Sequence, residues 1–424
     1  MLRKDADEKG FGEMSIIRDE SLAGEGIKKI DWVRGYMPIL DEIEKEFIEK
    51  RPFAGVKVAM SIHLEAKTAR FAHLLHKAGA EVFASGCNAL STKDDVCAGL
   101  ASLGVEVNAI HGCTQEEYFS HLKATLSHKP DVIVDDGGDF IKLLHEECPE
   151  YGANLIGGCE ETTTGIHRLK VMTREKRLKY PMIAVNDADC KRLFDNRYGT
   201  GQSVMDGIMN ATNVLLAGKN VVVAGYGWCG RGIAMRAKGM GARVIVTEID
   251  EVKALEAAMD GFSVMRMEEA APLGDFFVTA TGCCGIITKE HFLKMRDGAI
   301  LANAGHFDVE IDKNDLRGIS ERVENVRPYI DGYFLSDGRQ INLLSEGRLV
   351  NITAANGHPA DIMDMSFSIQ ALSCLYMVQN GKELTAGLYA VPEEIDARVA
   401  RIKLRSMGVS IDALSDEQKR YMNM

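Results

Sequence analysis

A glycine-rich turn in the middle of the chain is the segment whose residue types and spacing point most clearly to a ligand. An apolar run over 221–224 leads into Gly225-Tyr226-Gly227-Trp228-Cys229-Gly230-Arg231-Gly232, and a second run over 244–247 ends in Glu248. Glycines at this spacing let the backbone turn tightly beside a pyrophosphate, and the helix that follows offers free N–H groups to the phosphates. The acidic residue binds the ribose hydroxyls. The pattern predicts an NAD site that begins only after residue 220.

Two clusters of acidic and hydroxyl side chains could bind a polyhydroxylated ligand or move protons. Asp135-Asp136-Gly137-Gly138-Asp139 follows an apolar run, and it equally fits a tight turn whose aspartates bond their own backbone. Glu160-Glu161-Thr162-Thr163-Thr164-Gly165 suits neither a strand nor a helix, so we expect a ligand-binding loop, with a solvated cap as the alternative. Lys191 and Asp195 could place a cation beside a carboxylate, although a polar surface loop would contain the same residues.

Three histidines follow predicted strand ends or a sharp turn. His306 comes after an apolar run of the nucleotide-binding part, so it should face the cofactor. His63 follows another predicted strand, and His358 lies in a Gly-His-Pro turn. A single histidine is more often structural than catalytic, and only the shared position on the predicted cleft side favours catalysis. The histidines at 73, 76, 121, 128 and 291 lack this context and are predicted to be structural.

The elements that must position these residues alternate along the chain. Strands are expected at 56–60, 80–84, 105–110 and 132–134, and helices at 32–50, 65–78, 92–102 and 115–126. Such alternation predicts a parallel sheet covered by helices on both faces. Ligands of open parallel sheets lie beyond the carboxyl ends of the strands, so the polar clusters that follow these strands are candidate walls of a site.

A second alternating block begins near Asn220, and a loop-rich stretch over 186–201 is expected to separate the two. Its strands are expected around 221, 244, 264, 276 and 300. A helix predicted over 361–379 lies outside the nucleotide-binding repeat, so we expect it to cross back to the first domain. This gives two connections between the domains and a hinge.

The predicted fold class is α/β, with two doubly wound parallel-sheet (Rossmann-like) domains joined by a two-strand hinge and followed by a short C-terminal tail. We expect a substrate-binding domain over 1–188, completed by 358–393, and an NAD-binding Rossmann domain over 196–352. Residues 394–424 are expected to form a C-terminal helical and oligomerisation segment.

The composition excludes several classes of protein. The 424 residues carry a net charge of −12 without a lysine- or arginine-rich block, which argues against a nucleic-acid partner. No apolar run approaches the roughly 18–20 residues of a membrane span, and residues 1–26 lack the apolar core of a signal peptide. The ten cysteines contain no C-x-x-C pair, which predicts reduced thiols in a cytoplasmic protein with no disulfide framework and no bound metal.

Taken together, the segments match a family pattern. They are IHLE (62–65), NALSTKD (88–94), DDGGD (135–139), EETTTG (160–165), VND (185–187), FDN (194–196), the glycine turn, TEID (247–250), GHFDVEID (305–312), EGRLVN (346–351) and GHP (357–359). With these segments, in this order, the chain resembles the S-adenosylhomocysteine hydrolase (adenosylhomocysteinase) family over nearly its whole length. The S-inosylhomocysteine hydrolases of methanogens are the alternative branch.

The resemblance implies the NAD-dependent, reversible hydrolysis of S-adenosyl-L-homocysteine to adenosine and L-homocysteine. A transient 3′-keto intermediate makes the C4′ proton acidic, so that a base can remove it and the homocysteine thiolate can leave C5′. Water then adds, and the stored hydride returns to C3′. A buried lysine with a lowered pKa is expected to accept the 3′-hydroxyl proton.

The resemblance also implies roles for individual residues. Lys191 and Asp195 match the 3′-hydroxyl, Asp136 and His63 the C4′ and C5′ chemistry, and His306 the 5′ end, which completes the expected catalytic set. The expected substrate-binding residues are Glu65, Lys67, Thr68, Glu161 and His358. The expected cofactor-binding residues are Thr162, Thr163, Thr164, Asn196, Gly225, Gly227, Trp228, Cys229, Gly230, Arg231, Gly232, Glu248, Lys253, Thr281, Ala304, Gly305, His306, Asn351 and His358.

Several positions depart from the family pattern. Glu65 and Lys67 stand where many members have threonine and glutamate, and a lysine, which only donates, suits an O6 carbonyl better than an amine. S-inosyl-L-homocysteine is therefore the alternative substrate, while adenosyl stays the first expectation because Glu65 could accept from the amine. A family cysteine near the ribose is Thr200 here, and a family asparagine is Lys253.

The chain ends at Met424 without the lysine–tyrosine tail that many members send into a neighbour's NAD site. A homotetramer or homodimer is still expected, with a small nucleoside thioether as the binding partner. Two other functions fit parts of the pattern: a net NAD-dependent dehydrogenase, and a silent NAD-sensing module.

Overall fold

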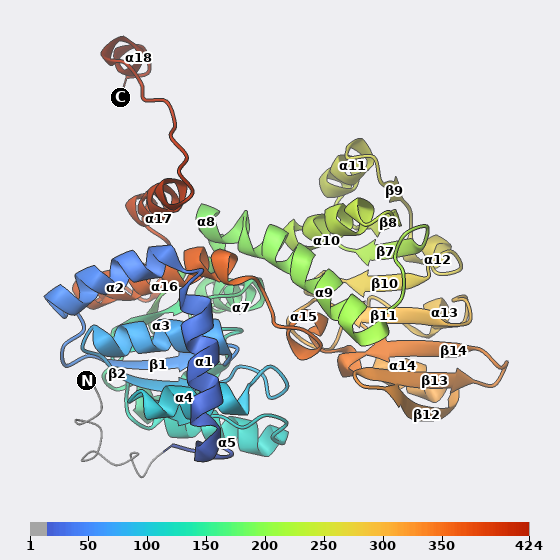
Figure 1. Ribbon diagram of the computed structural model, residues 1–424, viewed down its shortest axis with the longest axis horizontal. Coiled ribbons are helices and arrows are strands. Elements are labelled where there is room, and N and C mark those ends of the chain that lie inside the picture. The colour runs from blue at the N-terminus through green and yellow to red at the C-terminus, as the bar shows by residue number, and fades with distance from the viewer. Residues whose placement is uncertain (1–14, 424) are drawn as a thin grey trace.

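The computed structural model describes residues 15–423, which form two α/β lobes with one sheet each (Figure 1). The first lobe has a seven-stranded sheet of order β15-β6-β5-β4-β1-β2-β3, in which every strand pair is parallel. Its strands are apolar and mostly buried, because helices cover both faces of a parallel sheet. They are β1 (Lys57–Ser61), β2 (Glu81–Ser85), β3 (Glu106–Asn108), β4 (Val132–Asp135), β5 (Gly157–Glu160), β6 (Pro181–Ala184) and β15 (Gly387–Ala390).

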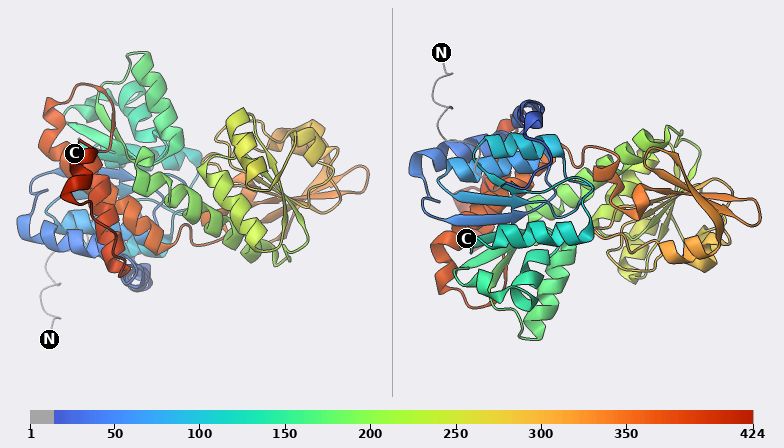
Figure 2. Two further views of the ribbon diagram at one scale, coloured as in Figure 1. Left: turned by 90° about the horizontal axis from the view of Figure 1, so that it is seen from above. Right: turned by 90° about the horizontal axis from the view of Figure 1, so that it is seen from below.

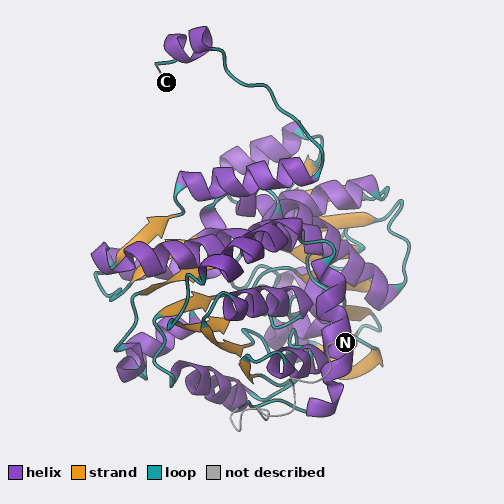
Figure 3. Cartoon of the chain, turned by 60° about the vertical axis from the view of Figure 1, so that its left-hand side comes forward, coloured by secondary structure: helices purple, strands orange, loops and turns teal. Residues whose placement is uncertain are grey.

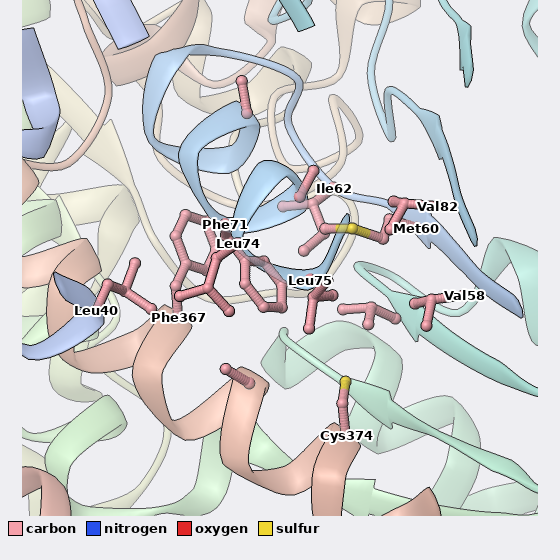
Figure 4. Close-up of a cluster of buried hydrophobic side chains, with 14 of the residues drawn as sticks. Leu40, Val58, Met60, Ile62, Phe71, Leu74, Leu75, Val82, Phe367 and Cys374 are labelled. Carbon is pink, nitrogen blue, oxygen red and sulfur yellow. The ribbon is translucent and has the colours of Figure 1, made fainter. Parts of the chain in front are cut away.

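Alternate residues of each strand serve two separate cores. On β1, Val58 and Met60 join one core and Ala59 joins the other, as a period of two requires. In the larger core, the Phe71 and Phe367 rings stack with their centroids 5.2 Å apart (Figure 4). The helices of this lobe are α1 (Ala23–Arg34), α2 (Pro38–Lys50), α3 (Ala66–Lys77), α4 (Asp94–Ser102), α5 (Gln115–Leu126), α6 (Asp139–Glu146), α7 (Thr163–Arg174), α16 (Ala360–Asn380) and α17 (Glu393–Ser406).

The second lobe has an eight-stranded sheet of order β12-β13-β14-β11-β10-β7-β8-β9. Its strands are β7 (Asn220–Ala224), β8 (Arg243–Thr247), β9 (Ser263–Val264), β10 (Phe276–Thr279), β11 (Ala299–Asn303), β12 (Ser320–Arg327), β13 (Ile330–Leu335) and β14 (Gln340–Leu344). The sheet is mixed, since β13 pairs antiparallel with both β12 and β14. The sequence reading anticipated the parallel strands but not this edge, whose outermost strand β12 is largely polar and exposed.

Short helices surround the second sheet. They are α9 (Thr200–Thr212), α10 (Trp228–Gly239), α11 (Glu251–Met259), α12 (Met267–Ala270), α13 (Lys289–Phe292), α14 (Lys313–Gly318) and α15 (Val350–Thr353). Two segments join the lobes: one leads from β6 into α9, and the other runs between α15 and α16. Figure 2 shows the lobes side by side, with the green helix α9 and the orange loop between α15 and α16 passing from one to the other.

The segment expected as a loop over 186–201 is instead almost continuously helical. It contains η3 (Val185–Asp187), α8 (Asp189–Arg192) and the π-helical turn η4 (Asp195–Gly199), which runs directly into α9. The N-terminus of α8 is capped from α17: Asp189 N and Cys190 N donate to the carboxylate of Asp396, at 2.6 and 2.8 Å. A partner more than 200 positions away leaves no local signal, which explains the wrong prediction.

Two further expectations were wrong in their local detail. The helix predicted over 32–50 is two helices, α1 and α2, because Pro38 starts the second one. The segment 160–165 is not a loop: Glu160 ends β5, and the hydroxyl of Thr162 caps α7 by accepting from Gly165 N at 2.9 Å.

The C-terminal segment leaves the body of the first lobe after α17. Residues beyond Met407 extend outward to α18 (Asp416–Tyr421), which has no buried residue (Figures 1 and 3). Among residues 15–423, no helix combines the length and apolar character needed to cross a membrane.

Candidate active site

The carboxyl ends of the central strands of the first sheet bring the acidic clusters together. Ser61 of β1 pairs in register with Asp135 of β4, and Asp135 pairs with Glu160 of β5. The chain therefore leaves all three strands at one level, and the residues just beyond them are His63, Asp136 and Glu161. Because parallel strands end at the same edge, residues about 25 to 75 positions apart become neighbours.

His63, Asp136 and His306 form the first group. The Nε2 of His63 lies 3.8 Å from Oδ2 of Asp136, and the Nδ1 of His306 lies 3.8 Å from Oδ1 of the same carboxylate. His306 follows β11 of the other lobe, so this group spans the two lobes. Cys87 donates its thiol to Asp136 at 3.3 Å, and Nδ1 of His63 hydrogen-bonds Oγ of Ser91 at 2.7 Å.

Within this group, His63 is neutral at physiological pH. Burial lowers the pKa of His63 to about 4, and it outweighs the attraction of Asp136. One ligand atom from each of His63, Asp136 and His306 lies within 4.8 Å of the other two, a spacing that a metal cation could bridge. The expectation of no metal stays a prediction.

Lys191, Asp195 and Glu161 form the second group, deep between α8, η4 and β5. The ammonium Nζ of Lys191 lies 2.9 Å from Oδ1 of Asn196, 3.3 Å from Oδ1 of Asp195 and 3.4 Å from Oε1 of Glu161. All of these side chains are buried. The same Asp195 oxygen lies 2.9 Å from Nδ1 of His358.

The expected lowering of the Lys191 pKa is wrong. Burial alone would lower the pKa, but the carboxylates of Asp195, Glu161 and Asp136 outweigh it and raise the pKa of Lys191. The sequence suggested a desolvated amine because it could not show how many carboxylates would converge on one lysine. Without substrate, Lys191 is therefore an ammonium ion.

The two carboxylates beside Lys191 respond differently to the same surroundings. Burial raises the pKa of Glu161 to about 7, although Lys191 acts against it. Burial would also raise the pKa of Asp195, but Lys191 and His358 outweigh it and hold that pKa below its usual range. At neutral pH, Glu161 is therefore the carboxylate that can gain or lose a proton.

Two residues of this group were missed by the sequence reading. Ser366 Oγ donates to Oδ2 of Asp195, and Gln370 Nε2 donates to Oε2 of Glu161, each at 2.6 Å. Both come from α16. The sequence offers little to single them out, because α16 also carries other buried polar residues, such as Asp364, Ser368 and Ser373.

Glu65, Lys67 and Thr68 lie at the start of α3, next to His63. The carboxylate of Glu65 accepts from the backbone N–H of Lys67 and Thr68, so it caps the helix. The buried ammonium of Lys67 donates to Glu65 at 2.6 Å and to the carbonyl of Asn356 at 2.9 Å. Thr68 Oγ1 donates to the carbonyl of His63 at 2.6 Å. The Lys67 head thus faces the loop that precedes His358.

The glycine turn of the second lobe has the shape of a dinucleotide cradle. A Cβ on Gly230 would lie 1.9 Å from the carbonyl oxygen of Gly225, and one on Gly232 would lie 1.8 Å from that of Arg197. Gly227, at the N-cap of α10, has open space in the Cβ direction, and no side chain caps the first N–H groups of the helix. Free N–H groups beside open space at a helix N-terminus fit a pyrophosphate.

Glu248, the acidic residue of the pattern, lies next to the glycine turn. Glu248 follows β8, and its carboxylate accepts from Tyr226 N at 2.6 Å and from Ile249 N at 2.7 Å. Trp228, Cys229 and Arg231 occupy the first turn of α10. The glycine turn, the start of α10 and Glu248 follow β7 and β8 at their carboxyl ends, where the adenosine half of NAD could bind.

The remaining cofactor candidates line the neighbouring edges. Thr281 follows β10, and Ala304 and Gly305 follow β11; the buried Glu310 holds the first by accepting from Thr281 N at 3.0 Å. In the connection, Asn196 Nδ2 donates to Asn186, which also accepts from Thr163. The other candidates come from three separate segments: Thr162 and Thr164 at the start of α7, Asn351 on α15, which donates to Ser203, and His358, which lies 3.2 Å from Thr200.

Among the described residues, the side chain of Lys253 makes no polar contact with the glycine turn. Its ammonium pairs with Asp250, at 3.4 Å, on an exposed part of α11. A cofactor contact by Lys253 stays a prediction.

One lobe has the glycine turn of a dinucleotide site, and it faces a buried lysine–carboxylate group. This combination is typical of two-lobed α/β enzymes that use a nicotinamide cofactor. Comparisons with known proteins narrow the class. A family model described as "S-adenosyl-L-homocysteine hydrolase" matches residues 14–156, and one described as "S-adenosyl-L-homocysteine hydrolase, NAD binding domain" matches residues 196–357. This chain belongs to the S-adenosyl-L-homocysteine hydrolase family, and its cofactor is NAD.

The similar relatives carry two different names. An adenosylhomocysteinase of Pyrococcus abyssi is 57% identical over 96% of this chain and 96% of its own. An S-inosyl-L-homocysteine hydrolase of Methanocaldococcus jannaschii is 54% identical over 96% of this chain and 98% of its own. An adenosylhomocysteinase of Aquifex aeolicus is 53% identical over 96% of this chain and 98% of its own. The comparisons therefore establish the family but do not determine which nucleobase the substrate carries. That question depends on the residues of the site.

Proposed function

We propose that this chain catalyses the NAD-dependent, reversible hydrolysis of S-adenosyl-L-homocysteine to adenosine and L-homocysteine, through transient oxidation of the ribose 3′-hydroxyl. The observation that carries the proposal is the pair of groups at one edge. Lys191 with its carboxylates can handle a hydroxyl, and Asp136 with its histidines can handle a C–H proton and a leaving group. The names of the similar relatives support this reaction.

When bound, NAD would accept a hydride from C3′ and later return it, so that no net oxidation occurs. The need for it is chemical: a C4′–H bond beside an ordinary ether carbon is too weak an acid for a side-chain base. A ketone at C3′ stabilises the carbanion as an enolate. The side chains then only have to move protons.

In the redox step, the Lys191 group orients the ribose and takes up the hydroxyl proton. Lys191 contacts the hydroxyl as a cation and stabilises the alkoxide that forms, while Glu161, with a pKa of about 7, takes up the net proton. Asp195 stays ionised because Lys191 and His358 hold its pKa low. Lys191, rather than working alone as a base, works as one member of a coupled set.

In the elimination step, Asp136 faces the reacting carbons. Its Oδ1 is buried and makes no hydrogen bond within residues 15–423, so a lone pair is available to a proton at C4′. Neutral His63 can pass a proton to or from the leaving group or water. His306 joins them only while the two lobes are close, because it comes from the cofactor lobe.

The test uses the purified protein with bound NAD and S-adenosyl-L-homocysteine. The proposal expects release of homocysteine thiol, no steady accumulation of free NADH, and loss of tritium from C4′ into solvent. A net dehydrogenase would instead produce stoichiometric NADH. A silent NAD-binding module would give no turnover despite bound NAD.

A specific observation favours a second candidate, the same chemistry on S-inosyl-L-homocysteine. The Lys67 ammonium has three N–H groups, and two of them already reach Glu65 and Asn356. The third can only donate, which suits the O6 carbonyl of hypoxanthine and not the amine of adenine. Several similar relatives are named S-inosyl-L-homocysteine hydrolase.

Rates on the two thioethers decide between these substrates. If kcat/KM is at least about tenfold higher on the inosyl thioether than on the adenosyl thioether, S-inosyl-L-homocysteine is the preferred substrate. Lys67→Gln, which restores an acceptor, should then shift the ratio toward adenosyl. The exposed Lys142 on α6 gives a control, since Lys142→Gln should leave the ratio unchanged.

We propose further that the protein is a homodimer or homotetramer in the cytoplasm. Val252, Leu255 and Met259 of α11 are exposed apolar side chains, as are Ile249 just before this helix and Tyr421 in the extended C-terminal segment. Large exposed apolar side chains favour association. All ten cysteines are free, which is typical of a reducing compartment. Light scattering measures the assembly, and the proposed domain limits (1–188 with 358–393, 196–352, and 394–424) can be checked by limited proteolysis.

A further inference from the structure

Helix α16 meets the Lys191 group from behind with two polar side chains. It is the long helix that returns from the cofactor lobe, and most of its residues are buried. Ser366 and Gln370 are four positions apart, so they lie on one face of the helix, one turn from each other. Both side chains are fully buried. Most buried polar side chains are hydrogen-bonded, so the partners of these two indicate what they do.

Each of the two donates to one carboxylate of the site. Gln370 Nε2 lies 2.6 Å from Oε2 of Glu161, and the other oxygen, Oε1, lies 3.4 Å from Lys191 Nζ. Ser366 Oγ lies 2.6 Å from Oδ2 of Asp195, and the other oxygen, Oδ1, lies 3.3 Å from Lys191 Nζ. Both carboxylates are therefore held between α16 and the lysine, with one oxygen fixed on each side.

The helix that carries the two donors is itself anchored to the first lobe. Asp364 accepts from the N–H groups of Ile39 and Leu40, at 3.1 and 2.9 Å, and so caps the start of α2. Phe367 stacks on Phe71 of α3 in the larger core of the first lobe (Figure 4). Donors on an anchored helix can fix the rotamers of the residues they bond.

We propose that Gln370 and Ser366 are positioning residues of the redox step: each binds one oxygen of its carboxylate and thereby aims the other oxygen at Lys191. This inference rests on the proposed function, since it concerns the step in which the ribose hydroxyl loses its proton. Neither residue contacts the reacting atoms. Their effect passes through Glu161 and Asp195.

The charges around Glu161 give the direction of the expected change. Lys191 of α8, Asp195 of η4 and Asp136 after β4 face this carboxylate, and Gln370 faces it from α16. Burial raises the pKa of Glu161, and the Gln370 hydrogen bond opposes that rise. Removing the donor should therefore raise the pKa further and reduce the ionised fraction at neutral pH.

The test measures reduction of bound NAD by adenosine or inosine alone, in a single turnover of the holoenzyme, as a function of pH. Gln370→Met keeps the length of the side chain and removes the donor. The rate near neutral pH should fall about 10- to 100-fold, as expected for a lost hydrogen bond to a charged group. The midpoint of the pH profile should move upward by about one unit, while nucleoside affinity changes much less.

Ser373 supplies the matched control. It lies on the same helix and is fully buried, and its hydroxyl makes no hydrogen bond within residues 15–423. Ser373→Ala should keep the wild-type rate within about twofold and leave the pH midpoint in place. Ser366→Ala changes little volume and should slow the same step, and Ser366→Thr, which keeps the hydroxyl, should restore it.

The outcomes separate this inference from the function on which it rests. If neither nucleoside reduces the NAD bound to the wild-type protein, the proposed function is wrong, and so is the inference that rests on it. If the wild type is reduced and Gln370→Met or Ser366→Ala keeps both its rate and its midpoint, the inference alone fails. An equal loss in Ser373→Ala would also overturn it, because a general disturbance of α16 would then explain the effect.

Discussion

The two lobes meet at one place but contribute different kinds of atoms. The first lobe offers charged and titratable side chains at the end of its sheet, with Asp136, Glu161 and Lys191 all buried. The second lobe offers mainly backbone: an uncapped helix start and glycines at Gly225 and Gly230, where a side chain would collide. Chemistry on a sugar needs side chains that exchange protons, whereas holding a pyrophosphate needs N–H groups and a close approach.

The two regions also differ in how they are built along the chain. The cradle of the second lobe is made by consecutive residues of one strand–turn–helix unit. The Lys191 group and its two donors come from α8, η4, α16 and the residue that follows β5, which are brought together only by folding. A local motif can be read from the sequence, but a group assembled from distant segments cannot be read in the same detail. Variants that disturb one region and spare the other test this division.

Lys191→Ala should have the largest effect. It removes the cation that faces three carboxylates, so bound NAD should be reduced by nucleoside up to about 10⁴-fold more slowly. The near-ultraviolet absorbance of NADH in a single turnover measures this step. Lys170→Ala, which breaks only an exposed ion pair with Asp187, is the control and should behave as wild type. An unchanged rate of NAD reduction in Lys191→Ala would remove the lysine from the redox step.

Asp136→Asn should divide the reaction into its two halves. The carboxylate lies with His63 and His306, so exchange of the C4′ proton and release of homocysteine should fall by about 10³-fold. Reduction of bound NAD by nucleoside should change far less, because the Lys191 group is intact. Tritium release from C4′ and thiol release are measured side by side with NADH absorbance. Equal losses in both halves would argue that the two groups work as one.

The redox step should depend on pH through Glu161. Its pKa is raised by burial to about 7, and the ionised form is the one that can take up a proton. The rate of NAD reduction should therefore rise with pH through about 7, and one unit below that value it should be about tenfold lower than its plateau at high pH. Glu161→Gln cannot ionise, so its residual rate should be low and should lose this transition. A wild-type profile that is flat between slightly acid and slightly alkaline pH would contradict the assignment.

Gly227→Ala and Gly230→Ala should separate binding from folding in the second lobe. A methyl on Gly230 would collide with the carbonyl of Gly225, so this variant should lose about 1–3 kcal/mol of stability even without NAD. Gly227 has open space in the same direction, so Gly227→Ala should keep the apo stability. It should weaken NAD binding by about fivefold, or about 1 kcal/mol, because the methyl would occupy cofactor space. Thermal unfolding of the apo protein and NAD titration measure the two effects.

The sequence predicted the fold class because its signals are local. Alternating apolar runs predicted strands such as β1 and β4, and the glycine spacing predicted the cradle before α10. The antiparallel edge at β12 and β13 was missed, because polar, exposed edge strands lack a clear apolar period. The helical connection at η4 was missed because its neighbours are capped by the distant Asp396.

The candidate site shows the same limit at the level of charge. The sequence named Lys191, Asp195 and Glu161, but it predicted the wrong direction for the pKa of the lysine. Burial and three carboxylates act on the pKa in opposite directions, and their balance depends on distances of a few ångströms. Ser366 and Gln370 were not predicted, because nothing in the sequence sets them apart from the other polar residues of this buried helix.

The sequence by itself determined which segments can bind a dinucleotide and which residue types are available for proton transfer, because glycine geometry and strand periodicity are properties of neighbouring residues. Only the tertiary structure decided which carboxylate faces Lys191, which oxygen of it is held by α16, and that His306 of one lobe reaches Asp136 of the other. Electrostatic energies depend on spatial separation and burial, and neither is fixed until distant segments pack together.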